Sequence, residues 1–215
     1  MTDFTKIREL FGLKTTNGLS EKEINDIKNL FGTIPEPLID YYRELGNFDY
    51  NYWQDDLIRF NENKKCHFKH FLDDNFMIIC HENQGVCYAG IKKSELFYKN
   101  PPVYFTLDAD QWKIGCDNLI DYIHGFAYIQ AAIGLDYNGS FDVSDNGIDF
   151  VRKNHKSKNI LFKNWLTNGN WEFYGDYNDT IIIIASETSL FYASNNEKHF
   201  IEMENKWKGK DIEYK

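Results

Sequence analysis

The polar and apolar positions between Ser20 and Gly46 predict two short helices. Ser20 and Glu23 have the spacing of a capping box, which marks the start of a helix, and Gly32 ends that helix. Pro35 then leads into a second helix, and we expect Gly46 to end it in a left-handed conformation. Apolar residues recur at helical spacing in both segments: Ile24, Ile27, Leu30 and Phe31, then Leu38, Tyr41, Tyr42 and Leu45. The pattern predicts a helical hairpin.

The middle of the chain predicts strands. Residues 76–81 and 86–91 are two apolar, β-forming runs joined by a turn at 82–85, and a third run follows at 103–107. If Asn83 and Gln84 are the central turn residues, Cys80 lies directly opposite Cys87. A hairpin and an adjoining strand are therefore expected.

The second half predicts a helix, then strands, then a helix. The first helix starts at Cys116 or Asp117 and ends at Gly134. Residues 135–149 are rich in Asp, Gly, Ser and Asn and predict a loop. Strands follow at 171–174, 180–186 and 190–193, and the four isoleucines at 181–184 indicate a strand covered on both faces. Ser194 and Glu197 form a second capping box, with Phe200, Met203 and Trp207 on one face of the helix. The expected inward residues of the first helix are Leu119, Tyr122, Ile123, Phe126, Ala127 and Ile133.

This order of elements predicts an α+β fold, with a twisted and mainly antiparallel sheet packed with helices. We expect one domain over residues 1–215, in which 135–149 is the best internal boundary and 135–215 forms a strand–strand–helix extension. Apolar residues make up 42% of the 215 residues and aromatic residues 17%, enough to fill a sizeable core. No apolar run reaches the roughly 20 residues that a membrane-spanning helix needs. The start of the chain lacks a signal-peptide pattern, so a cytoplasmic protein with reduced cysteines is expected.

The negative charge is concentrated in residues 101–150. The whole chain carries 33 acidic and 24 basic residues, a net charge of −9. Residues 101–150 hold eight aspartates and a single base, Lys113, a net charge of −7. Such a surface disfavours direct nucleic-acid binding and favours cationic partners. The alternative is an acidic surface that only keeps the protein soluble.

Two segments carry metal-ligating residue types. Cys66, His67 and His70 lie close together, but a structural zinc site needs four ligands, and no second pair follows at metal spacing. A buried cysteine beside surface histidines is the favoured interpretation. Residues 136–142 begin like a calcium loop. Whether the loop starts at Asp136 or at Asp142, the chain does not supply both the required Gly and the bidentate Glu. We favour solvated turn residues over a loose calcium site near 136–145, and expect no metal or cofactor.

Catalytic motifs are missing from the sequence. His81 and Glu82 could be imagined as an acid–base pair, but neighbouring residues on a strand point to opposite faces. The chain has no Gly-x-Ser-x-Gly elbow, no cysteine in a protease context and no phosphate-binding glycine loop. The sequence therefore favours a protein that is not an enzyme.

The stretch 47–56 is rich in aromatic and acidic residues and shows neither the helical nor the strand period of apolar residues, so we expect a loop there. Aromatic side chains are the usual anchors of protein interfaces, and aspartates beside them can pair with basic residues of a partner. The alternative is that alternate aromatics pack inward on an irregular strand.

Two segments resemble a known family. Ile34-Pro35 with Leu38, Tyr41-Tyr42 and Gly46 is similar to the opening of the SUKH superfamily, which includes yeast cell-wall-synthesis regulators and many bacterial immunity proteins. Residues 82–91 (Glu-Asn-Gln-Gly-Val-Cys-Tyr-Ala-Gly-Ile) look like the central hairpin of bacterial members, followed by 100–104 and Trp112. The resemblance covers about residues 20–133. Ala89, where Trp is common, and the Asp-rich segment after 134 depart from the family pattern.

The resemblance implies a non-catalytic α+β domain that binds and neutralises a cognate toxin, often a nuclease, in the cytoplasm. We expect that toxin to be basic, and expect no direct contact with nucleic acid or membrane. The rivals are a regulatory scaffold that inhibits no enzyme, and a hydrolase whose site the sequence does not reveal, which changing His81 and Glu82 to Ala would test. The residues expected to form the partner-binding surface are Asp49, Tyr50, Tyr52, Trp53, Asp55, Asp56, Asp108, Asp110, Asp136, Asp142 and Asp145.

Overall fold

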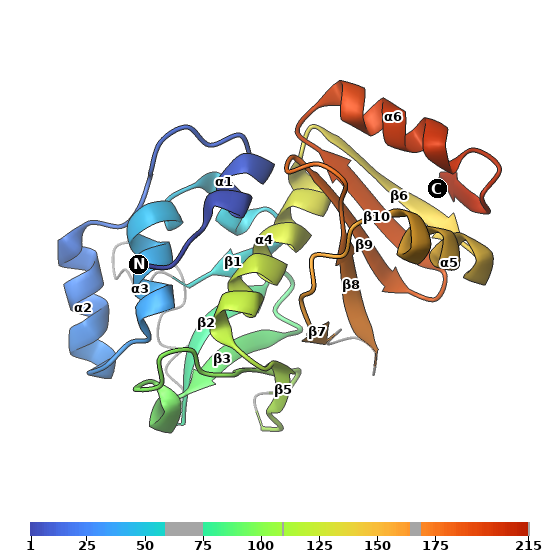
Figure 1. Cartoon of the computed structure of the whole chain (residues 1–215). Helices are drawn as coiled ribbons and strands as arrows, with labels where there is room; N and C mark the ends of the chain where they lie inside the picture. The colour runs from blue at the N-terminus through green and yellow to red at the C-terminus, as the bar shows by residue number, and fades with distance from the viewer. Residues whose placement is uncertain (59–74, 109, 164–168, 215) are drawn as a thin grey trace. The chain divides into compact units, whose positions relative to one another are not determined.

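The computed structural model describes residues 1–58, 75–108, 110–163 and 169–214 (Figure 1). The chain divides into two compact units: unit 1 consists of Met1–Asp3 and Thr15–Ile123, and unit 2 of Phe4–Lys14 and His124–Lys215. The described residues form helices and two antiparallel sheets, which confirms the predicted α+β class. The expectation of a single domain over 1–215 stays a prediction.

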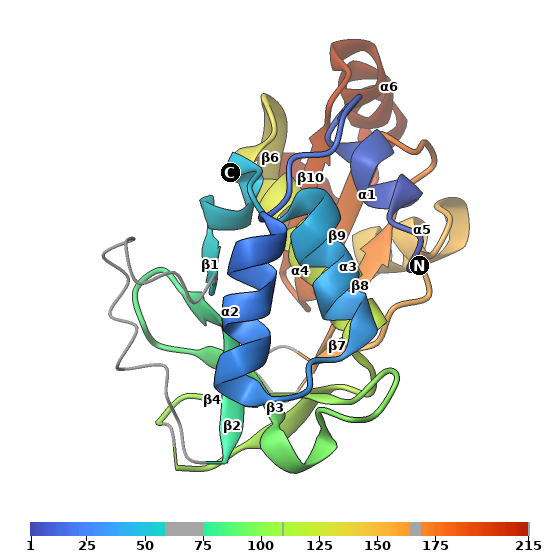
Figure 2. The same ribbon diagram turned by 90° about the vertical axis from the view of Figure 1, so that its left-hand side faces the viewer.

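In unit 1, two helices lie side by side and a sheet follows (Figure 2). The helices are α2 (Glu21–Phe31) and α3 (Glu36–Leu45), and a 3₁₀ turn, η1 (Asp49–Tyr52), comes next. The sheet has the order β1-β2-β3-β4-β5, with η3 (Lys93–Glu95) after β3. The strands are β1 (Asp55–Leu57), β2 (Phe76–Glu82), β3 (Tyr88–Lys92), β4 (Val103–Thr106) and β5 (Lys113–Cys116).

The predicted helical hairpin is confirmed, with one correction. Ser20 and Glu23 form the capping box, and Gly32 ends α2 at a φ of 78°. Gly46 ends α3 with right-handed φ and ψ, so the predicted left-handed cap is wrong. A Cβ on Gly46 would lie 2.7 Å from the carbonyl oxygen of Tyr42. Glycine is therefore needed there for close backbone approach.

The hairpin of β2 and β3 is confirmed, but its predicted register is wrong. Cys80 pairs with Ala89 and His81 with Tyr88, so Cys80 does not face Cys87. The connection is longer than two residues, because the backbone N–H of Glu82 bonds to the carbonyl of Cys87. Gly85, at a φ of 73°, provides the left-handed position within it.

Unit 2 is built around a sheet with the order β11-β6-β10-β9-β8-β7. Its strands are β6 (Tyr137–Val143), β7 (Phe162–Lys163), β8 (Asn170–Tyr174), β9 (Thr180–Ser186), β10 (Ser189–Ser194) and β11 (Ile212–Tyr214), and its helices include α1 (Thr5–Leu10), α5 (Asp145–Asn154) and α6 (Glu197–Trp207). Helix α4 (Leu119–Gly134) begins in unit 1 and continues in unit 2. The isoleucines at 181–184 are all buried, as predicted.

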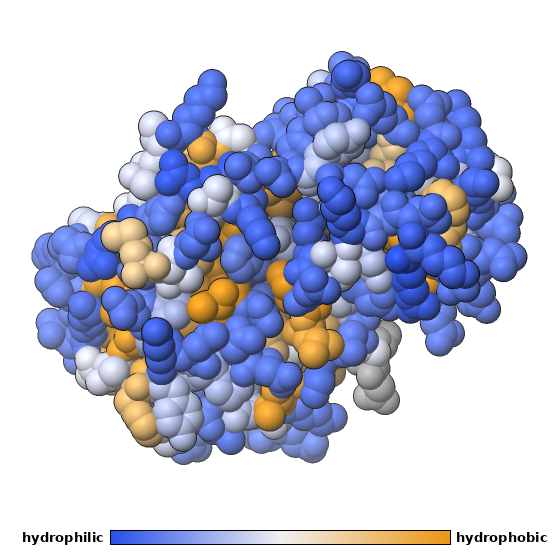
Figure 3. Space-filling view, in the orientation of Figure 1, coloured by the Kyte–Doolittle hydropathy of each residue, from blue (hydrophilic) through white to orange (hydrophobic). Residues whose placement is uncertain are grey.

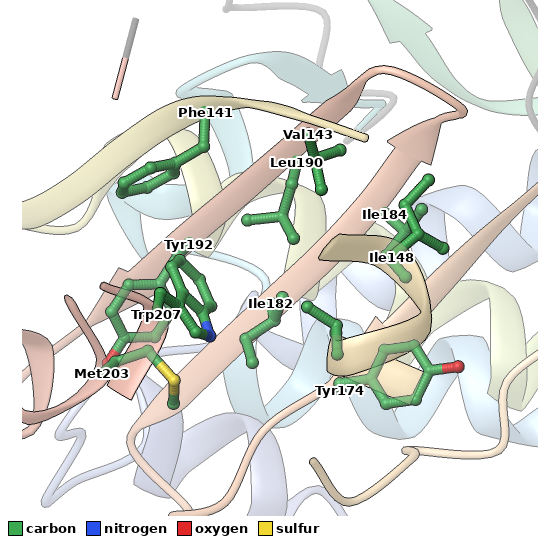
Figure 4. Close-up of a cluster of buried hydrophobic side chains, with 11 residues drawn as sticks. Phe141, Val143, Ile148, Tyr174, Ile182, Ile184, Leu190, Tyr192, Met203 and Trp207 are labelled. Carbon is green, nitrogen blue, oxygen red and sulfur yellow. The ribbon is translucent and has the colours of Figure 1, made fainter. Parts of the chain in front are cut away.

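The core of unit 2 lies between the sheet and the helices α5 and α6 (Figure 4). Trp207 at the end of α6 packs edge-on against Phe141 of β6, with ring centroids 5.2 Å apart. Tyr192 of β10 contacts the same indole ring. The buried cluster consists of Phe141, Val143, Ile148, Val151, Tyr174, Ile182, Ile184, Leu190, Tyr192, Met203 and Trp207. These contacts fix α5 and α6 on the sheet.

Segment 135–149 forms β6 and the start of α5, so the predicted loop is wrong. Gly139, Phe141 and Val143 are buried at alternate positions of β6, but glycine adds almost no hydrophobic signal to this two-residue period. Ser144 then caps α5 by accepting a hydrogen bond from the N–H of Gly147.

Three smaller predictions are also wrong. The start of α4 is capped by Asn118, whose side-chain oxygen accepts the N–H of Asp121, and not by Cys116 or Asp117. Ile133 is 39% exposed, in contrast to the other residues expected to face inward from α4. Helix α6 is capped by Asn196, because Ser194 still belongs to strand β10.

Candidate partner-binding surface

The expected partner-binding residues are distributed over both units. Asp49, Tyr50, Tyr52, Trp53, Asp55, Asp56, Asp108 and Asp110 belong to unit 1, whereas Asp136, Asp142 and Asp145 belong to unit 2.

The aromatic segment of unit 1 is partly core. Residues 49–52 form η1 and 55–57 form β1, so the expected loop over 47–56 is largely replaced by regular structure. Tyr50 is 3% exposed, and its hydroxyl lies 2.9 Å from that of Tyr41, so it cannot anchor a partner and this prediction is wrong. Burial is the main cause of the raised pKa of Tyr50. Trp53 remains exposed, whereas the hydroxyl oxygen of Tyr52 is buried.

The two aspartates of β1 have neighbours within the sheet. Asp55 pairs with Glu82 and Asp56 with His81 across the β1–β2 ladder. Burial, followed by the nearby carboxylates of Glu82 and Asp56, raises the pKa of Asp55 to about 7. Burial also raises the pKa of Asp56, although its carboxylate lies 3.3 Å from the Nε2 atom of His81. Asp49 of the same region is exposed.

His81 and Glu82 point to different partners, as expected for neighbours on a strand. The ring of His81 pairs with Asp56, while the carboxylate of Glu82 accepts the backbone N–H of Gln84 at 2.8 Å. Glu82 therefore stabilises the turn between β2 and β3, which is the role predicted for it.

Asp108 is exposed, but it has a structural role in its turn. Its carboxylate accepts the backbone N–H groups of Gln111 at 2.9 Å and of Asp110 at 3.0 Å, and these bonds lower its pKa. Asp110 is exposed as well. Both residues lie between β4 and β5.

The three aspartates of unit 2 are all exposed, but they do not form one patch. Asp136 precedes β6, whereas Asp142 and Asp145 lie at its other end. Seven residues of strand span about 20 Å. In unit 2, only Asp142 and Asp145 therefore lie near each other, and their role in binding stays a prediction.

Asp145 lines a hollow of about 780 Å³. The first two turns of α5 form one side, and the ends of β8 and β9 with the β9–β10 turn form the other. Asp142 is next to this hollow, because it pairs with Ser189, which follows the lining residue Thr188. Hydrophilic residues dominate the surface over α5 on the face drawn in Figure 3. The residues that line the hollow are Asp145, Asn146, Ile148, Asp149, Arg152, Gly169, Asn170, Glu172, Ile184, Ala185, Ser186, Glu187 and Thr188.

Arg152 of α5 is tied to Glu172 of β8 in this hollow. The guanidinium donates hydrogen bonds to both carboxylate oxygens, including one from Nε at 3.1 Å. Arg152 is the main cause of the lowered pKa of Glu172. Tyr174 also donates its hydroxyl to this carboxylate at 2.7 Å. The pair joins the helix to the sheet and fixes one wall of the hollow.

The lining carries more negative than positive charge. Its ionisable side chains are Asp145, Asp149, Glu172 and Glu187 against Arg152, which gives a net charge of −3. Since Arg152 is already bonded to Glu172, the other three carboxylates determine the sign of the hollow. Asp149 is approached by Lys153 at 3.3 Å and by Arg152 at 4.0 Å, but both pairs are well exposed and add little.

Sequence reasoning did not single out Asp149, Arg152, Glu172 or Glu187. The first two share a face of α5, at a spacing of three residues, but the sequence predicts a loop up to residue 149 and no element directly after it. Glu172 and Glu187 belong to different strands or turns, so no sequence spacing brings them together.

The metal hypotheses gain nothing from the structure. Within the described ranges, no group of three or more His, Cys, Asp or Glu side chains could hold a metal ion. The segment with Cys66, His67 and His70 lies outside these ranges. The calcium-like residues 136–142 form the extended strand β6 and the residue before it. Within the same ranges, the helices are too short or too polar to cross a membrane.

Comparison with known proteins adds no family. No protein-family model matches the chain, and searches of curated proteins and of solved structures gave no significant match.

Proposed function

We propose that this protein is a non-catalytic immunity protein, which binds a basic cognate toxin through the acidic hollow of unit 2 and thereby neutralises it. The observation that carries the proposal is the unbalanced charge of a concave surface. Asp145, Asp149 and Glu187 surround a pair, Arg152 and Glu172, that already neutralises itself. A concave acidic surface attracts lysine and arginine side chains and accelerates their arrival.

That the partner is a toxin rests on the resemblance of residues 20–133 to the SUKH superfamily. Bacterial members of that superfamily bind toxins in the cytoplasm, and we propose the same location here. A toxin that acts on nucleic acid has a basic groove, which an acidic protein can occupy in place of phosphate. We therefore propose that the acidic hollow of unit 2 binds the positively charged active surface of the toxin.

Growth of a bacterial host tests this function. The host expresses the protein encoded immediately upstream of this chain, and growth is measured with and without the chain. We expect the upstream protein to stop growth and the chain to restore it. Restoration should fail for Asp145→Asn/Asp149→Asn/Glu187→Gln and persist for the matched variant Asp117→Asn/Glu197→Gln/Glu204→Gln, whose substitutions lie outside the hollow and outside the residues expected to bind the partner.

Two results would contradict the proposal. An upstream protein without toxicity, combined with stable binding to several cellular proteins, would favour the regulatory scaffold. Chemical turnover by the purified chain that is lost in His81→Ala/Glu82→Ala would favour the hydrolase.

A further inference from the structure

The ring of His155 is enclosed at the point where α5 ends. Its side chain is 0% exposed, and both ring nitrogens have partners. The Nε2 atom lies 3.2 Å from the indole Nε1 of Trp207, the last residue of α6. The Nδ1 atom lies 2.9 Å from a carboxylate oxygen of Asp176, in the turn between β8 and β9. His155 therefore connects both helices to the sheet of unit 2.

These partners determine the tautomer of His155. An indole N–H can only donate, so Nε2 must accept, and the ring proton must be on Nδ1 and point to Asp176. Lys206 supports this arrangement, because its ammonium group bonds Asp176 at 2.9 Å and the carbonyl of Asn154 at 3.1 Å. The neutral ring thus offers an acceptor to Trp207 and a donor to Asp176, and the Nζ atom of Lys206 lies 3.5 Å from Nδ1. His155, Asp176, Lys206 and Trp207 are called here the His155 cluster.

A second proton on His155 does not fit this cluster. The new N–H at Nε2 would point at the N–H of Trp207, so two donors would face each other without an acceptor. The charged groups that face the ring are Asp176 from the β8–β9 turn and Lys206 from α6, and these have opposite signs. The remaining ring contacts come edge-on from Phe150 of α5 and from Trp207.

We propose that the His155 cluster is an acid-sensitive switch, in which protonation of His155 releases the C-terminal end of α6 from α5 and from the sheet. Release breaks the bond between Trp207 and His155 and moves Trp207 away from Phe141 and Tyr192. This inference does not depend on the proposed function, because no residue of the His155 cluster lines the acidic hollow.

The direction of the effect follows from proton linkage. Burial is the largest cause of the lowered pKa of His155, and Lys206 adds to it, although Asp176 opposes both. The released histidine returns to an ordinary value near 6.5, so the released state binds the extra proton first. The closed state, in which Trp207 bonds His155, is favoured above pH 6.5 and loses this advantage as the pH falls below that value. Each pH unit below 6.5 should multiply the opening constant by about ten until closed His155 itself titrates.

Nuclear magnetic resonance of the full chain tests the switch. Ring ¹⁵N signals of His155 report its tautomer and titration, and exchange of the Trp207 indole proton, corrected for the intrinsic rate, reports opening. We expect the Nδ1–H tautomer at neutral pH and a roughly tenfold rise in opening per pH unit below 6.5. His155→Gln, which cannot titrate, should remove the rise. Trp207→Phe, which removes the opposing N–H, should let His155 titrate at a higher pH than in the unchanged protein.

Two observations would overturn the switch. The first is an ordinary titration of His155 near 6.5 in the unchanged protein with no change in indole exchange. The second is a rise in opening that persists in His155→Gln. His199→Gln is the matched control, because His199 also bonds a carboxylate, that of Asp179, but is 23% exposed. It should leave the rise intact, and the measurements on the unchanged protein decide the question even if a variant does not fold.

Discussion

Asp55 of β1 lies directly across the antiparallel ladder from Glu82 of β2, so two carboxyl groups face each other at the edge of the described sheet of unit 1. Glu82 is 5% exposed, and Asp55 is partly buried beside it. Like charges at opposite positions destabilise a ladder, and burial disfavours the ionised form of Asp55. This explains why the pKa of Asp55 rises to about 7.

This relationship predicts a stability that falls as the pH rises. Folded Asp55 holds its proton up to a pH of about 7, whereas the unfolded residue loses it near 3.8. The free energy of unfolding therefore decreases across that window. Asp55→Asn keeps the neutral form, so we expect it to stabilise unit 1 at pH 8 by roughly 3 kcal/mol and to have little effect at pH 3. Urea denaturation at both pH values measures this difference. Asp110→Asn, on an exposed turn, should leave the free energy of unfolding unchanged at both pH values. An equal effect of Asp55→Asn at both pH values would contradict the explanation.

The bond between Arg152 and Glu172 predicts a measurable contribution to the stability of unit 2. The arginine side chain is 47% exposed and the glutamate 31%, so solvent weakens the pair. We expect Glu172→Gln to lower the free energy of unfolding by about 1 kcal/mol at pH 7. Because Arg152 lowers the pKa of Glu172, this loss should shrink as the pH falls below 4.5.

The neighbouring ion pair provides the comparison. Lys153 and Asp149 are four residues apart on α5 and are 73% and 58% exposed. Lys153→Gln should cost no more than about 0.5 kcal/mol in the same urea experiment. If both substitutions cost the same, the paired hydrogen bonds of Arg152 add nothing to stability.

The capping box of α2 predicts a graded loss of stability. The hydroxyl of Ser20 accepts the N–H of Glu23, and the carboxylate of Glu23 accepts the N–H of Ser20 at 2.8 Å. Ser20→Ala removes the first bond and should cost about 1 kcal/mol. Ser20→Gly should cost only a few tenths of a kcal/mol, because glycine tolerates the extended backbone and leaves the N–H of Glu23 open to water. Thermal unfolding measures both, and a negligible cost of Ser20→Ala would show that the hydroxyl bond is unimportant.

The features that the sequence predicts well are local in the chain. Ser20 and Glu23 signal a helix start within four residues, and Gly32 signals its end. The isoleucine run at 181–184 identifies a buried strand without help from its neighbours. Each of these signals depends on the residues themselves, so partners elsewhere do not change it.

The features that the sequence misses depend on distant partners. Strand β6 follows a period of two in which Gly139 occupies a buried position, so its pattern resembles a loop. Tyr50 lies in an aromatic and acidic run that suggests a surface, yet its hydroxyl reaches Tyr41 of α3. Arg152 and Glu172 come together because α5 packs on β8, which the spacing of twenty residues does not reveal.

The central claim is that the acidic hollow of unit 2 binds a basic toxin, and the affinity of the purified complex at increasing salt tests it most directly. The partner is the inactivated upstream protein, and calorimetry measures its binding to the chain between about 50 and about 500 mM salt. Over this range the Debye length falls from roughly 14 Å to roughly 4 Å. We predict an affinity that falls steeply with salt, and a loss of about tenfold or more in Asp145→Asn/Asp149→Asn/Glu187→Gln at low salt. An affinity that changes neither with salt nor in this variant would contradict the claim.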